Sequence, residues 1–88
     1  MEKKEFRTLI KRDGKLGNND YVMGVISGII NGLAYDSLCE DEKDEYKLYA
    51  IDLAKEGSII TVNCSSKVYH QIVRTVEYCY PGLCVFNY

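Results

Sequence analysis

Apolar and polar residues alternate along residues 5–12 with the two-residue period of a β-strand. One side of such a strand carries Phe6, Thr8 and Ile10. The other side carries Arg7, Leu9 and Lys11. Successive side chains of a strand point to opposite faces of a sheet, so we expect the first set to face a core. The glycines and asparagines of residues 13–19 then predict a loop.

Two later segments carry the period of about 3.6 residues that identifies an α-helix. In residues 21–37, after the capping residue Asp20, the aliphatic stripe consists of Val22, Ile26, Ile29, Ile30 and Leu33. In the segment between Ser65 and Pro81, the stripe consists of Val68, Ile72, Val76 and Cys79. The polar face of this second helix carries Lys67, His70, Arg74 and Glu77. Residues 83–88 are expected to form a short last strand.

The segment between the helices contains the clearest strand and the least clear element. Residues 58–64, rich in β-branched side chains, predict a strand. Residues 42–56 fit a helix, because helix formers follow a run of acids and Gly57 can end the helix. They also fit a strand, because Tyr49, Ile51 and Leu53 share one face. We favour the strand, which then forms a hairpin that turns at residues 55–57.

The predicted order is strand, helix, strand, strand, helix, strand, within one domain formed by residues 1–88. This α+β order is that of the split βαβ, or ferredoxin-like, arrangement. In it, two helices cover one face of a four-stranded antiparallel sheet. If residues 42–56 were helical instead, the fold would have three helices and a three-stranded sheet.

Composition narrows the class of protein. Hydrophobic residues make up 47% of the chain and charged residues 27%, which is typical of a folded domain. The longest apolar stretch, residues 21–35, is too short and too often interrupted by polar residues and glycines to span a membrane. No apolar signal segment follows the N-terminus, so we expect a cytoplasmic protein whose four cysteines are free thiols.

The sequence does not group residues as an active site or a metal site would require. Cys79 and Cys84 have four residues between them, whereas structural zinc sites usually have two between paired cysteines. The single histidine, His70, could activate Cys64 only across the start of the second helix. We therefore expect no enzyme, no metal and no cofactor, and keep a Cys64–His70 pair as the enzymatic alternative.

Direct binding of nucleic acid is not expected either. Sheets of this topology bind bases through aromatic side chains on their central strands. The third strand instead offers Ile59, Thr61 and Asn63. The net charge of −2 gives little attraction for a polyanion, although residues 1–15 are basic overall.

The most distinctive pattern is a glycine at every fourth position of the first helix. The side opposite the aliphatic stripe carries six residues suited to an interface: Tyr21, Gly24, Gly28, Asn31, Gly32 and Tyr35. Each helical glycine costs about 0.8–1 kcal/mol relative to alanine, so a contact that needs bare backbone should offset this cost. Either the second helix makes this contact as an internal seam, or another molecule makes it. The two tyrosines favour another molecule.

These features favour a non-enzymatic protein that docks onto another protein and self-associates as a homodimer. A second contact for a basic partner is predicted in the acidic segment Glu40, Asp41, Glu42, Asp44 and Glu45. In size, acidity and lack of catalytic residues, the chain is similar to the small inhibitors of host nucleases that phages and mobile elements encode, including anti-CRISPR proteins. Such an acidic run can imitate the phosphates of a nucleic acid. The alternative is a homodimeric regulatory domain that senses a small ligand.

Overall fold

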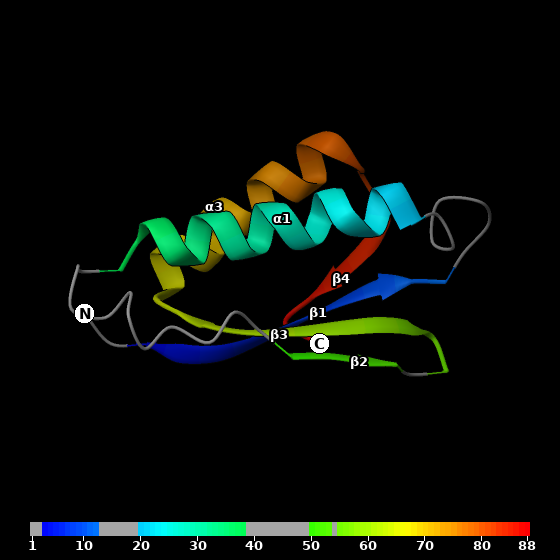
Figure 1. Cartoon of the computed structure of the whole chain (residues 1–88), viewed down its shortest axis with the longest axis horizontal. Helices are drawn as coiled ribbons and strands as arrows, with labels where there is room; N and C mark the ends of the chain where they lie inside the picture. Colours follow the sequence, from blue (N-terminus) through cyan, green and yellow to red (C-terminus); the bar gives the residue numbers. More distant parts are fainter. Residues whose placement is uncertain (1–2, 13–19, 39–49, 54) are drawn as a thin grey trace.

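The computed structural model describes residues 3–12, 20–38, 50–53 and 55–88. Within these ranges the elements follow in the order β1 (Lys4–Lys11), α1 (Asp20–Asp36), β2 (Ala50–Leu53), β3 (Gly57–Cys64), α3 (Ser66–Cys79) and β4 (Cys84–Phe86). The strands form one four-stranded sheet in the order β2-β3-β1-β4, and every neighbouring pair is antiparallel. Both helices lie on the same face of this sheet (Figure 1). The predicted α+β fold with the split βαβ topology is confirmed.

The hairpin between β2 and β3 shows which structure part of the ambiguous segment, residues 42–56, adopts. Leu53 is paired with Ser58 and Ala50 with Thr61, so residues 50–53 are a strand. A helix through residues 42–56, and the three-stranded alternative that depended on it, are therefore wrong. Residues 42–49 lie outside the described part of the chain.

Gly57 begins β3 rather than ending a helix. Its φ of +156° is one that side chains rarely adopt, and a Cβ atom there would overlap the carbonyl oxygen of Ile10. Lys11 is its partner on β1, so the glycine lets the two central strands approach each other at the start of their ladder. The need for glycine at this position comes from a contact between strands.

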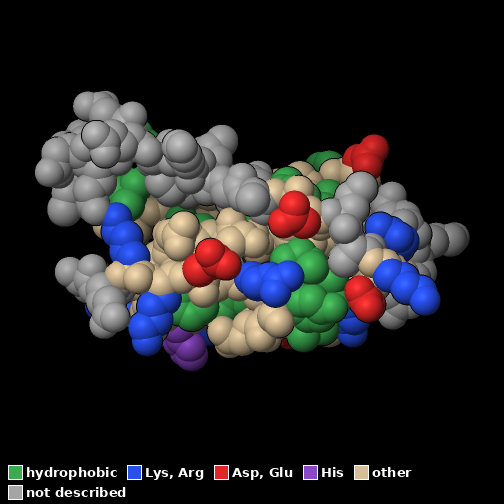
Figure 2. All heavy atoms as spheres, turned by 90° about the horizontal axis from the view of Figure 1, so that it is seen from below, with side chains coloured by type: hydrophobic (Ala, Val, Ile, Leu, Met, Phe, Trp, Pro, Cys, Tyr) green, Lys and Arg blue, Asp and Glu red, His purple; other side chains and the backbone are tan. Residues whose placement is uncertain are grey.

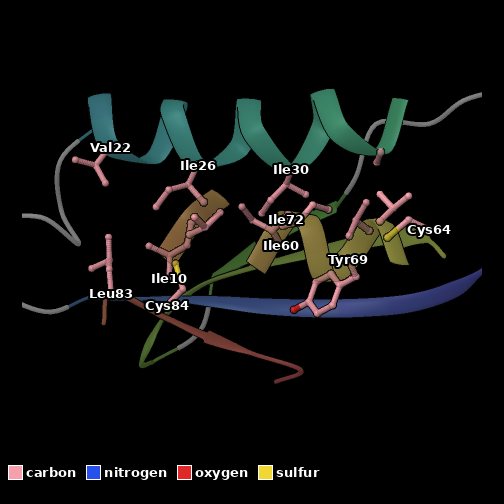
Figure 3. Close-up of a cluster of buried hydrophobic side chains, with 14 residues drawn as sticks. Ile10, Val22, Ile26, Ile30, Ile60, Cys64, Tyr69, Ile72, Leu83 and Cys84 are labelled. Atoms are coloured by element: carbon pink, nitrogen blue, oxygen red, sulfur yellow. The ribbon is translucent and has the colours of Figure 1, made fainter. Parts of the chain in front are cut away.

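The core lies between the sheet and the two helices, and Figure 3 shows its largest side chains pointing toward one another. The sheet and both helices contribute fully buried aliphatic residues to this core. They are Ile10 and Ile60 from the sheet, Ile26 and Ile30 from α1, and Ile72 and Val76 from α3. The predicted aliphatic stripes of both helices therefore face the sheet. Cys79 is the exception: it is exposed, because it is the last residue of α3.

The face of the sheet away from the helices also contains buried apolar residues. Leu9, which the alternation placed on the side away from the core, is opposite Ile59 on one side and Val85 on the other. Leu9 is only 3% exposed and Ile59 only 6%, yet neither belongs to the main core cluster. Leu9 therefore lies on the side of β1 that the alternation predicts, and β1 buries side chains on both of its faces.

Tyr69 of α3 joins three parts of the fold through its side chain. Its ring stacks on Phe6 of β1, with 4.2 Å between ring centroids. Its hydroxyl donates to the carbonyl oxygen of Arg7 at 3.2 Å and accepts from the backbone N–H of Asn87 at 3.1 Å. A tyrosine hydroxyl has one proton, so the hydroxyl of Thr8, 2.8 Å away, must be the donor in the remaining contact.

Asn87 reaches this hydroxyl because the backbone turns after β4. Its φ of 58° lies in the left-handed region, which asparagine tolerates better than most residues. The turn also lets the backbone N–H of Tyr88 donate to the carbonyl oxygen of Arg7 at 2.9 Å. The Arg7 guanidinium then lies 5.7 Å from the centroid of the Tyr88 ring.

We predict that Tyr69→Phe lowers the free energy of unfolding by about 1–3 kcal/mol, because Thr8 is 0% exposed and loses a buried partner. Urea unfolding followed by circular dichroism measures this change. The matched control is Tyr78→Phe, since Tyr78 is 89% exposed and its change should be within about 0.5 kcal/mol. Adding Thr8→Val to Tyr69→Phe should recover part of the loss. If Tyr69→Phe and Tyr78→Phe had the same free energy of unfolding, the hydrogen bonds of the Tyr69 hydroxyl would contribute nothing to stability.

Candidate docking surface

The glycine stripe of α1 faces away from the core. An ideal Cβ built on Gly24, Gly28 or Gly32 meets no atom of the described residues within 4 Å, so no described part of the chain covers these three glycines. The opposite side of the helix is buried on the sheet through Val22, Ile26 and Ile30 (Figure 3). The internal seam against α3 is therefore wrong, because α3 packs beside α1 without covering its glycines.

Two tyrosines lie at the ends of this stripe. Tyr21 is 76% exposed and Tyr35 is 38% exposed. Each lies two helical turns from Gly28, in opposite directions along α1. We call the surface formed by Tyr21, Gly24, Gly28, Gly32 and Tyr35 the glycine face.

Asn31, the sixth predicted interface residue, lies one turn from Gly28 at the edge of this face. Its Oδ1 atom is buried and has no hydrogen-bond partner among the described residues. A buried acceptor without a donor costs about 1–3 kcal/mol. All six predicted residues thus lie on α1, and the Asn31 Oδ1 atom has no partner in the described part of the chain.

The outer side of α3 lies beside the glycine face and was not predicted as a site. A hollow of about 680 Å³ runs along it, and its described lining residues are Gln71, Arg74, Thr75, Glu77 and Tyr78. All five belong to a single helix, so the hollow is an open depression of the surface. None belongs to α1, so the concave ligand pocket expected at the glycine face by the ligand-sensing alternative is not seen among these residues.

Two of the described cysteines, Cys64 and Cys84, are buried. Burial raises the pKa of the Cys64 thiol to about 11, which disfavours the reactive thiolate. Burial also raises the pKa of Cys84 to about 11, with Glu77 adding to the rise and Lys11 opposing it. His70 is exposed. The raised pKa of Cys64 argues against the Cys64–His70 alternative.

The described residues also lack the features of a metal site or a membrane segment. In residues 3–12, 20–38, 50–53 and 55–88, no three His, Cys, Asp or Glu side chains are placed to hold a metal ion. No helix in the same ranges is long and apolar enough to cross a membrane. The acidic segment Glu40, Asp41, Glu42, Asp44 and Glu45 lies outside the described residues, so its role stays a prediction.

The face of the sheet away from the helices does not resemble a surface that stacks bases. Figure 2 shows basic and acidic side chains interspersed across this face. Both central strands, β1 and β3, are described throughout, and the register places Leu9, Ile59 and Thr61 here. Phe6, the aromatic residue of β1, is on the helix side, stacked on Tyr69. Neither central strand therefore offers an aromatic side chain to a base.

Comparisons with protein-family models, with curated proteins and with solved structures found no match for this chain. The glycine face was predicted from the sequence, whereas Tyr78, which is 89% exposed, was not. A helical wheel of α3 would have placed this residue beside Lys67 and Arg74 on the outer side.

We predict that Gly28→Ala raises the free energy of unfolding by about 0.8–1 kcal/mol, because its methyl group enters open space on an exposed helix. Gly57→Ala is the contrasting variant and should lower it by about 2 kcal/mol or more, since its methyl group would meet the Ile10 backbone. Thermal unfolding of both variants checks this. A loss of stability in Gly28→Ala would mean that the glycine face is packed against something within the chain.

We predict that iodoacetamide at pH 8 modifies Cys79 and spares Cys64 and Cys84 in the folded protein. The pKa values of about 11 leave roughly a hundredfold less thiolate at the two buried positions than an ordinary thiol has. The same shifts make the folded state less stable as pH rises from about 9 to 11, where the unfolded thiols ionise first. Peptide mapping by mass spectrometry locates the modification, with urea-unfolded protein as the control. Rapid modification of Cys64 in the folded protein would contradict this account of its burial.

Proposed function

We propose that this protein is a non-enzymatic docking module that binds another protein through the glycine face of α1. One observation carries the proposal: three glycines on successive turns of one helix, between two exposed tyrosines, are covered by no described residue. Three alanines in their place would stabilise the helix by roughly 2–3 kcal/mol. That is a large part of the stability of a small domain, so the bare backbone is best explained by close approach of a partner.

The chemistry of this surface fits a macromolecule better than a small molecule. A helix without side chains along one line allows another helix or strand to approach its backbone closely. Tyrosines at both ends can bury large apolar rings while keeping their hydroxyls hydrated, which is common at protein interfaces. Burial of Cys64 argues against the enzymatic alternative, in which this thiol would act with His70.

We further propose that the partner is a host nuclease and that the protein inhibits it, as the anti-CRISPR proteins of phages and mobile elements do. The small size and the net charge of −2 support this proposal. The acidic segment of residues 40–45 would enter the cationic channel of the nuclease, while the glycine face holds the body of the inhibitor. This action belongs in the cytoplasm, where such nucleases meet invading DNA.

The docking proposal is tested by immobilising the wild-type protein, Gly28→Leu and Gly28→Ala, and comparing the proteins that each retains from a bacterial lysate. We expect a partner that binds the wild type and Gly28→Ala but not Gly28→Leu, whose longer side chain blocks close approach. Circular dichroism and thermal unfolding confirm that Gly28→Leu is folded. If all three baits retain the same proteins, the glycine face is not the docking site.

The inhibitor proposal is tested with a panel of purified RNA-guided nucleases. We expect the protein to slow DNA cleavage by at least one of them at stoichiometric ratios, and less so at high salt. Replacing Glu40, Asp41, Glu42, Asp44 and Glu45 with glutamine and asparagine should remove most of the inhibition. Unchanged cleavage across the panel would overturn the nuclease assignment, and undiminished inhibition by the neutralised variant would overturn phosphate mimicry.

A further inference from the structure

We draw no further inference here: the strongest candidate, the apolar cluster that Leu9, Ile59 and the exposed Val85 form on the face of the sheet away from the helices, is an unpartnered apolar face, and nothing among the described residues shows what covers it.

Discussion

The position of α3 depends on one buried hydroxyl group. Tyr69 donates its proton to the Arg7 carbonyl, accepts from Asn87 N–H and receives the proton of Thr8. A single side chain of α3 is thereby fixed to β1 and to the residue that follows β4. Because Thr8 and Tyr69 are almost fully buried, each polar atom needs its partner, and the helix cannot slide along the sheet without losing several bonds together.

The fixed position of α3 also determines which of its side chains lie on the outer surface of the protein. Tyr69, Ile72 and Val76 hold one side of the helix on the sheet, so Lys67, Arg74 and Tyr78 must point outward. In α1, the residues Val22, Ile26 and Ile30 do the same and leave the glycines outside. The core and the candidate docking surface are therefore two consequences of one packing arrangement (Figures 1 and 3).

The fold could be predicted from the sequence because its strongest signals are local. The spacing of Val22, Ile26 and Ile30, and the β-branched run of β3, each identify an element without knowledge of its neighbours. The burial of Leu9 could not be predicted, because it depends on the register that places Ile59 and Val85 beside it. The hydrogen bonds of Tyr69 could not be predicted for the same reason, since Thr8 is 61 residues away in the sequence. The glycine face was visible as a pattern, whereas its openness depended on where α3 packs.

The lengths of the edge strands have a consequence for how the protein can assemble. The central strands β1 and β3 have 8 residues each, whereas the described part of β2 at one edge has 4 and β4 at the other edge has 3. Edge strands this short leave few unpaired backbone groups for a strand of another molecule, which protects a sheet against uncontrolled growth into larger aggregates. A protein built this way can be abundant in a cell and still meet its neighbours mainly through helices, where side chains rather than backbone ladders decide which neighbour is accepted.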